Sequence, residues 1–168
     1  MLDVKIKSDN IEILNVEGKD ISMLFHYMKS NKFNGNLNCH PVSNEEELRE
    51  TFIECYLSEC EFFIKVMYKD KLKGILKGRA EFKNPNEIWL LYFLRFENEN
   101  INFNWEEIIT KLEKYFFMQY GIDKFYVIIN RFNLDMIKMF KNNGFVPIRI
   151  YKKVKNGNLD NDNIVFFK

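Results

Sequence analysis

Apolar and polar positions alternate along some parts of the chain and recur every three or four residues along others. Alternation predicts a first strand over Ile11–Val16. The next stretch predicts a helix with Asp20 as its N-cap, because an Asp side chain accepts hydrogen bonds from the first backbone N–H groups of a helix. The buried face of this helix is expected to consist of Ile21, Leu24, Phe25 and Met28.

A second helix is predicted after a polar loop over residues 31–42. Ser43 and Glu46 have the spacing of a capping box, in which each side chain satisfies a backbone N–H group of the other residue. The buried face of this second helix is expected to consist of Leu48, Phe52 and Tyr56.

The middle of the chain is rich in strand patterns. Glu61–Tyr68 and Leu72–Phe82, joined at Lys69–Asp70, predict an antiparallel hairpin. Ile88–Phe96 is apolar almost throughout, which is typical of a central strand that is covered on both faces.

A helix and a further buried strand follow. Trp105–Tyr120 has helical spacing, with Asn104 and Glu107 in capping positions and Gly121 at its end. Phe125–Ile129 then predicts a strand parallel to 88–96, joined to it by a right-handed crossover. We expect these two strands to be central and to diverge at their carboxyl ends, which leaves a cleft.

The last part of the chain predicts one more helix and a hairpin. Asn133 is placed to cap a helix over 134–143, which ends at Gly144. Phe145–Val154 and Ile164–Phe167 then predict an antiparallel pair around a polar turn. The exposed edge of this hairpin favours pairing with a second copy, so a homodimer is a further expectation.

Composition narrows the class of protein without indicating a reaction. The chain has 168 residues, of which 46% are hydrophobic and 29% charged, so we expect one folded domain over residues 1–168. Lys and Arg exceed Asp and Glu by a single charge. This balance argues against a protein dedicated to nucleic acid or to an anionic membrane surface.

Three cysteines and the absence of a secretory leader favour a cytoplasmic protein. No apolar run approaches the roughly 20 residues that a membrane helix needs. Cys39, His40, Cys55 and Cys60 lack the spacing of a zinc site, so no metal is expected.

The order β-α-α-β-β-β-α-β-α-β-β, an α/β arrangement with a mixed sheet, resembles the GNAT superfamily of acyl-CoA-dependent N-acetyltransferases. The most specific local feature is the segment 133–145, which is similar to the family pattern N-x-x-A-x-x-x-Y-x-x-x-G-F. Asn133, Phe140, Gly144 and Phe145 occupy the matching positions. The resemblance covers most of the chain and most firmly residues 61–168.

The resemblance implies an acyltransferase that moves an acetyl group from acetyl-CoA to a primary amine of a small molecule or peptide, by direct attack of the amine. Glu87, Tyr92 and Tyr151 are the candidate proton-transfer residues that this implies. The acidic run Glu45–Glu47 lies where the acceptor approaches in the family, and it would favour a cationic substrate. The implied acetyl-CoA-binding residues are Phe93, Leu94, Arg95, Asn100, Ile101, Asn102, Phe103, Asn104, Trp105, Asn133 and Phe140.

Two features depart from the family pattern. The loop 97–104 contains none of the glycines and no Arg of the family's pyrophosphate-binding loop, and Glu106 and Glu107 follow it. Phe140 stands where many members carry a tyrosine that protonates the departing thiolate. A second interpretation is therefore a non-catalytic binding or interaction module of the same fold that has lost its pyrophosphate loop.

Overall fold

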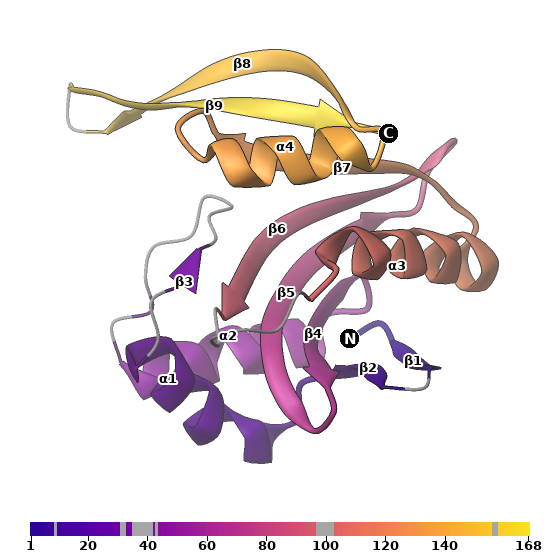
Figure 1. The fold of residues 1–168 in the computed structure, drawn as a ribbon, viewed down its shortest axis with the longest axis vertical. Coiled ribbons are helices and arrows are strands. Elements are labelled where there is room, and N and C mark those ends of the chain that lie inside the picture. Colours follow the sequence, from indigo (N-terminus) through magenta and orange to yellow (C-terminus); the bar gives the residue numbers. More distant parts are fainter. Residues whose placement is uncertain (9, 31–32, 35–41, 43, 97–102, 156–157) are drawn as a thin grey trace.

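The computed structural model of the protein describes residues 1–8, 10–30, 33–34, 42, 44–96, 103–155 and 158–168, and a mixed sheet runs through the whole molecule (Figure 1). Its strands are ordered β1-β2-β4-β5-β6-β7-β9-β8. The strands are β1 (Lys5–Ser8), β2 (Ile11–Asn15), β3 (Phe33–Asn34), β4 (Glu61–Tyr68), β5 (Lys71–Glu81), β6 (Asn86–Phe96), β7 (Ile122–Asn130), β8 (Val146–Lys155) and β9 (Asn158–Phe167).

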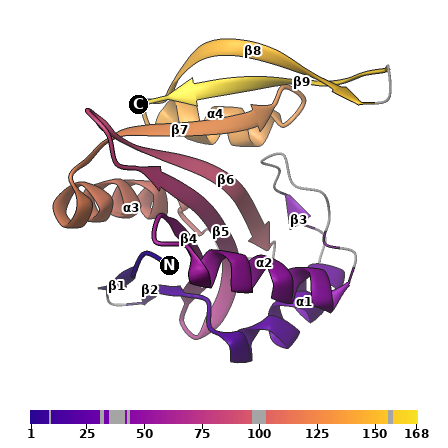
Figure 2. The same ribbon diagram turned by 180° about the vertical axis from the view of Figure 1, so that it is seen from behind.

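Four α-helices cover the two faces of this sheet in pairs (Figure 2). α3 and α4 pack on one face over a core that includes Phe62, Phe93 and Phe116. α1 and α2 pack on the other face over a separate core that includes Leu48 and Phe63. The helices, with a short 3₁₀ turn at Gly18–Asp20, are α1 (Ile21–Ser30), α2 (Glu45–Leu57), α3 (Trp105–Tyr120) and α4 (Leu134–Asn142).

The two parallel strands are adjacent and central, and they separate toward their carboxyl ends, as predicted. β6 pairs with β7 from Asn86↔Ile122 to Leu90↔Val127, and β6 then continues to Phe96 away from β7. β3 pairs with the last two residues of β6. The backbone of β6 between Leu90 and Arg95 therefore borders a gap between the two strands. The architecture is the mixed α/β fold that the GNAT resemblance implies.

A β-bulge lies where the two parallel strands separate. Lys77 of β5 is opposite Tyr92 of β6, whereas Gly78 is opposite Leu90, so β6 has one extra residue, Leu91, in the register with β5. A bulge bends its strand and redirects neighbouring side chains. The irregularity in β6 thus lies just before Phe93–Arg95, which are among the implied acetyl-CoA-binding residues.

Several local predictions are confirmed because neighbouring residues suffice to determine them. Lys69 and Asp70 both have positive φ, at 47° and 60°, which is the geometry of the tight hairpin turn between β4 and β5. Asn104 caps α3, and Gly121 ends it with φ at 62°. Asn133 caps α4 through its side chain, which accepts a hydrogen bond from the Met136 N–H.

Other local predictions are wrong, in each case because a neighbouring group takes the expected role. Asp20 does not cap α1: it ends the 3₁₀ turn, accepts from the Glu17 N–H at 2.8 Å and pairs with Lys65 at 2.6 Å. Asn44 rather than Ser43 caps α2, by accepting from the Glu47 N–H at 2.9 Å. Ser43 itself lies outside the described residues.

The buried face of α2 and two strand assignments also differ from expectation. Cys55 is fully buried where Tyr56 was expected, and Tyr56 is 62% exposed. β1, which pairs with β2, was not predicted, because its short alternation of Lys and Ile carries a weak signal. The closing hairpin is longer than predicted, since β8 runs to Lys155 and β9 begins at Asn158.

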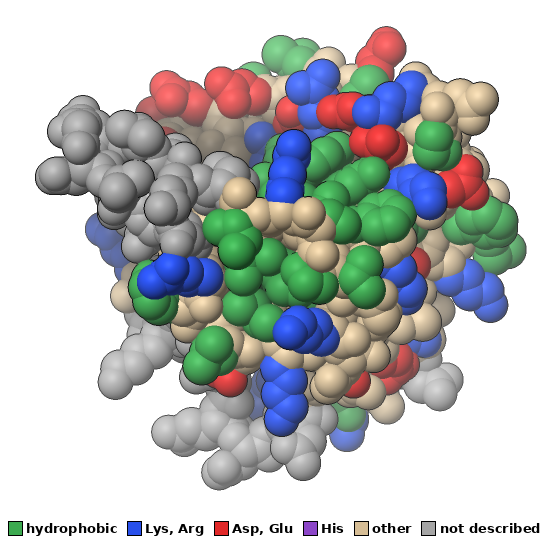
Figure 3. All heavy atoms as spheres, turned by 90° about the horizontal axis from the view of Figure 1, so that it is seen from above, with side chains coloured by type: hydrophobic (Ala, Val, Ile, Leu, Met, Phe, Trp, Pro, Cys, Tyr) green, Lys and Arg blue, Asp and Glu red, His purple; other side chains and the backbone are tan. Residues whose placement is uncertain are grey.

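β8 forms the edge of the sheet and carries large apolar side chains in solvent. Val146, Ile148 and Ile150 are each about half exposed or more, at 52%, 49% and 66%. Viewed from this end of the molecule, hydrophobic side chains gather in a patch with Lys and Arg side chains beside it (Figure 3). Contiguous apolar surface of this kind on an edge strand favours contact with another chain.

Within the part of the chain that the structure describes, no helix has the length and apolar character needed to cross a membrane.

Candidate functional site

A cavity of about 350 Å³, which we call the α2 cavity, opens on the face that α1 and α2 cover, beside the gap between β6 and β7. It lies between the first turns of α2 and the strand residues where the parallel pairing stops. Its lining is mostly apolar and consists of Val42, Glu47, Leu48, Thr51, Phe63, Lys77, Leu90, Leu91, Tyr92 and Ile128.

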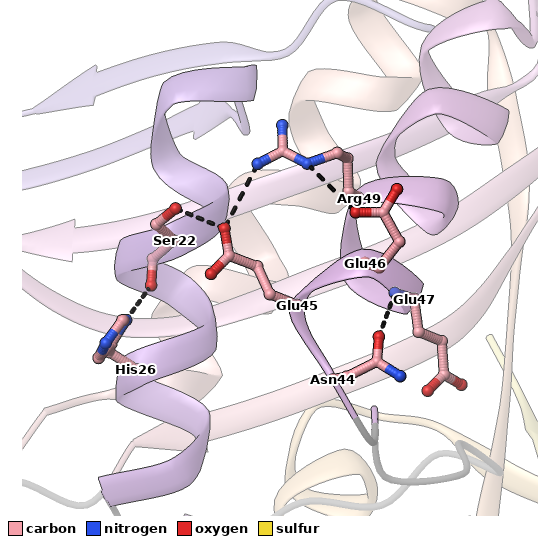
Figure 4. A network of polar contacts seen from close by, with 7 residues as sticks. All are labelled: Ser22, His26, Asn44, Glu45, Glu46, Glu47 and Arg49. Atoms are coloured by element: carbon pink, nitrogen blue, oxygen red, sulfur yellow. Dashed lines mark hydrogen bonds and ion pairs between the residues drawn. The ribbon is translucent and has the colours of Figure 1, made fainter.

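The first turn of α2 divides its three carboxylates between two roles (Figure 4). Glu45 accepts from the Ser22 hydroxyl at 2.5 Å and from Arg49 at 3.3 Å, and Glu46 lies 4.0 Å from Arg49. Glu45 thus faces α1 and Arg49, and Glu46 also approaches Arg49. Glu47 turns away from Arg49, and among the described lining residues of the α2 cavity it is the one carboxylate.

The other polar groups of the α2 cavity are already oriented by the fold. Lys77 pairs with Glu61 at 3.1 Å, which offsets the charge of the one cation among the described lining residues. The Thr51 hydroxyl donates to the Glu47 backbone carbonyl at 2.9 Å. Tyr92 lines the cavity from β6, and its hydroxyl lies 4.0 Å from the Met28 sulfur. A carboxylate and a phenol thus line the same cavity beside a bulged strand.

A second cavity of about 350 Å³, which we call the α3–α4 cavity, lies on the opposite face of the sheet. Two cations and two carboxylates line it, next to aromatic and thioether groups. Its lining consists of Arg95, Phe103, Asn104, Trp105, Glu106, Asp135, Lys138, Met139 and Asn142.

The ring of Trp105 fits over β5 because residue 74 is glycine. A Cβ atom at Gly74 would lie 2.6 Å from Trp105 Cη2 and 2.3 Å from the Leu94 carbonyl oxygen. Trp105 also meets Phe93 and Phe103 edge to face, with ring centroids 5.0 and 4.9 Å apart. These aromatic contacts form the floor of the α3–α4 cavity.

The N-terminus of α3 points into the α3–α4 cavity with its N–H groups already engaged. The Asn104 side-chain oxygen accepts from the backbone N–H groups of Glu106 and Glu107, at 3.0 and 3.2 Å. The Glu106 carboxylate in turn accepts from the Asn142 amide at 2.8 Å, which links α3 to α4. Two of the groups with which a helix N-terminus ordinarily binds an anion, the N–H groups of Glu106 and Glu107, thus have a protein partner.

The predicted site residues fall into distinct places. Tyr92 lies at the α2 cavity, and four predicted acetyl-CoA-binding residues line the α3–α4 cavity: Arg95, Phe103, Asn104 and Trp105. Phe93 is buried in the core on the α3–α4 face, and its ring meets Phe140 with centroids 6.3 Å apart. Leu94 is buried in the core on the α1–α2 face.

Three predicted site residues are placed away from both linings. Glu87 lies at the closed end of the parallel pair, where it binds Lys83 at 2.9 Å and accepts from the Trp89 indole N–H at 3.3 Å. Asn133 caps α4, and Phe140 packs edge to face on Phe145 with ring centroids 5.0 Å apart. Asn100, Ile101, Asn102 and the side chain of Tyr151 lie outside the described part of the structure.

Glu47, Leu91 and Ile128 are lining residues that the sequence analysis did not single out as site residues. The acidic run that contains Glu47 was noted only as a cluster favouring a cationic substrate. Leu91 and Ile128 have the sequence pattern of ordinary strand residues, and no local sequence signal marks the bulge in β6.

Metal and nucleophile chemistry find no support among the described side chains. Within those ranges, no group of three or more His, Cys, Asp or Glu side chains could hold an ion. Cys55 is fully buried, and burial raises the pKa of its thiol to about 11. This thiol therefore stays protonated near neutral pH and is a poor nucleophile.

Comparison with known proteins gives a consistent result. The chain matches the acetyltransferase (GNAT) domain family over residues 13–165. No curated sequence matches it.

Solved structures with the same fold are distant in sequence. One is an acetyltransferase from Salmonella typhimurium that modifies the N-terminal serine of ribosomal protein L7/L12, with a TM-score of 0.77, 16% identity and coverage of 96% of this chain and 95% of that one. Another is a dodecameric spermidine N-acetyltransferase from Vibrio cholerae, with a TM-score of 0.73 and 14% identity. The match covers 96% of this chain and 94% of that one. A third is the microcin C7 self-immunity acetyltransferase in complex with acetyl-CoA and AMP, with a TM-score of 0.76 and 16% identity. The match covers 96% of this chain and 93% of that one.

Proposed function

Because the chain belongs to the GNAT acetyltransferase family, we propose that it transfers an acetyl group from acetyl-CoA to a primary amine. The α3–α4 cavity is the donor side of this proposal and the α2 cavity is the acceptor side. The observation that carries the proposal is the gap in the sheet where β6 and β7 stop pairing, since one cavity lies on each face beside it.

The α3–α4 cavity has groups that suit a part of acetyl-CoA where its apolar arm meets its phosphates. Phe103, Trp105 and Met139 supply apolar surface for the arm, and Arg95 and Lys138 supply positive charge for the phosphates. Acetyl-CoA supplies a thioester, whose carbonyl carbon is the electrophile. Arginine and lysine side chains thus take over the charge compensation that a glycine-rich loop at the N-terminus of α3 would provide.

On the acceptor side, the amine must lose a proton before it can attack. The Glu47 carboxylate attracts the incoming ammonium by its charge and then accepts this proton, directly or through one water, which leaves a neutral amine and a protonated carboxyl group. The backbone of the Leu91 bulge orients the thioester carbonyl at the gap.

Transfer then balances in one displacement. The C–N bond forms as the amine nitrogen attacks the carbonyl carbon, and the C–S bond breaks. Tyr92 donates its phenolic proton to the leaving sulfur, a role that Phe140 has no proton to fill. The nitrogen then loses its second proton to water, and the Tyr92 phenolate regains a proton from water. Direct attack agrees with the burial of Cys55, which leaves that thiol unreactive.

The alternative function is a binding module that holds no acetyl-CoA. The engaged N–H groups and the carboxylates at the N-terminus of α3 favour this alternative. Incubation of the purified protein with acetyl-CoA and a set of primary amines separates the two. The enzyme proposal expects free thiol and acetylated amine, the latter identified by mass spectrometry, in equal amounts. Absence of both products, together with no binding of acetyl-CoA in calorimetry, supports the module.

The homodimer expected from the sequence remains a proposal that rests on β8. Two copies could pair their β8 edges around a two-fold axis and cover Val146, Ile148 and Ile150. Light scattering after gel filtration should then give twice the monomer mass, and Ile150→Lys should lower it to the monomer. A monomeric parent protein would contradict this proposal.

A further inference from the structure

The α2 cavity also indicates what kind of amine it receives. Resting on the proposed function, we infer that the acceptor is a primary amine attached to an uncharged apolar body, rather than a polyamine or an amino acid. The inference depends on how apolar and charged groups are distributed in the lining of the cavity.

The walls that would contact the body of the substrate are apolar. Leu48, Phe63 and Leu90 are 1%, 1% and 4% exposed, so their side chains are fixed by the cores on which they pack. Val42, Leu91 and Ile128 continue this surface toward the gap. Apolar walls favour an apolar ligand, because they offer no hydrogen bonds to replace those that a polar body loses on leaving water.

The charges of the cavity suit a single ammonium. Among the described residues of the lining, Glu47 is the only carboxylate, and Glu45 and Glu46 form ion pairs with Arg49 outside it. A second ammonium group would therefore find no carboxylate of its own and would approach Lys77. A substrate carboxylate would meet Glu47, while Lys77 is already compensated by Glu61 at 3.1 Å.

The size of the cavity suits a small molecule. Its volume of about 350 Å³ holds roughly a dozen non-hydrogen atoms, if each takes about the 30 Å³ of a water molecule in the liquid. Hexylamine fits this limit and provides a probe whose far end can be changed without altering the reacting amine.

Three matched amines test the inference directly. Hexylamine, 1,6-diaminohexane and 6-aminohexanoate share one alkyl chain and differ only in the charge at the far end. Thiol release at saturating acetyl-CoA gives kcat/KM for each. We expect hexylamine to be preferred by about tenfold or more over the other two, because a buried unpaired charge is costly.

The possible results separate the inference from the proposed function. Equal or better turnover of either charged probe overturns the inference and leaves the acetyltransferase proposal standing. If none of the three amines releases thiol and acetyl-CoA does not bind, the proposed function fails and the inference fails with it.

A substitution at Leu91 provides an independent test within the same cavity. Leu91 is 37% exposed, so a polar side chain is tolerated there without burying a charge in the core. Leu91→Glu adds a second carboxylate and should reduce the preference for hexylamine over 1,6-diaminohexane by about tenfold, whereas Leu91→Gln should not. Melting curves check that both variants fold. An equal change in the two variants overturns the inference.

Discussion

The two cavities beside the β6–β7 gap are similar in size but opposite in character. The α2 cavity has apolar walls, one carboxylate at Glu47 and one phenol at Tyr92. The α3–α4 cavity combines Arg95 and Lys138 with Glu106 and Asp135, around an aromatic floor. The first suits a small amine with an apolar body, and the second suits a long donor that carries phosphates.

The difference shows where this chain keeps to the family architecture and where it departs from it. In the proposed function, the gap, the bulge and the α2 cavity receive the amine. The N-terminus of α3 differs from the usual pyrophosphate cradle, because Asn104 accepts from two of its N–H groups and Glu106 adds negative charge. We therefore expect donor binding to depend on side-chain cations more than on these N–H groups.

The largest expected effect is a loss of kcat from a substitution at Tyr92, which lines the α2 cavity. Tyr92→Phe removes the proposed proton donor while keeping the ring, so kcat should fall about 100-fold with little change in KM for acetyl-CoA. Steady-state thiol release measures both constants. Tyr126→Phe is the matched control, because Tyr126 stacks on Trp89 with ring centroids 4.5 Å apart and lines neither cavity.

Tyr151→Phe belongs in the same experiment, since Tyr151 is the other phenol that the sequence indicates as a donor. A loss of kcat in Tyr151→Phe with none in Tyr92→Phe would assign the proton to Tyr151 and refute the role of Tyr92.

A smaller effect, on stability and on acetyl-CoA affinity, is expected from substitutions at Asn133, the cap of α4. Asn133→Ala should lower the free energy of unfolding by about 1 kcal/mol, because α4 loses its cap. Asn133→Asp keeps a capping oxygen but removes the amide donor, so stability should be retained while acetyl-CoA affinity falls. Denaturant unfolding and calorimetry measure the two quantities. Unchanged affinity in Asn133→Asp would leave this residue with a capping role alone.

The smallest effect concerns the negative charge at the start of α3. Changing Glu106 and Glu107 together to Gln removes two carboxylates near the expected phosphates, so acetyl-CoA should bind a few times more tightly. The gain should shrink between about 0.05 and 0.5 M salt, because exposed charges are screened. Equal affinities of parent and variant at low salt would show that these carboxylates do not oppose the donor.

The sequence predicts the elements that local signals determine. The helix 105–120, with Asn104 and Gly121 at its ends, and the hairpin turn at Lys69–Asp70 depend on neighbouring residues, and both are confirmed. The parallel pairing of 88–96 with 125–129 could also be predicted from the sequence, because near-continuous apolar strands joined by a helix have few alternative arrangements.

The site was harder to predict from the sequence, because its geometry arises from contacts between distant segments. The bulge at Leu91 depends on the register between β5 and β6, and no residue type marks it. Glu47 lines the α2 cavity while Glu45 and Glu46 form ion pairs with Arg49, a division that three adjacent glutamates in the sequence do not reveal. Glu87 was a candidate base, yet its position next to Lys83 and Trp89 places it at the far end of β6 from the gap.

The central claim is that a donor in the α3–α4 cavity reaches an amine in the α2 cavity through the β6–β7 gap. A single ligand can test this: CoA whose sulfur carries a carboxymethyl group joined by an amide bond to hexylamine. Calorimetry compares it with CoA whose sulfur carries only a carboxamidomethyl group. If the cavities communicate, the hexyl conjugate should bind about 100-fold more tightly, because its second part binds at high effective concentration. Equal dissociation constants would mean that the hexyl arm does not reach the α2 cavity, and would contradict the claim.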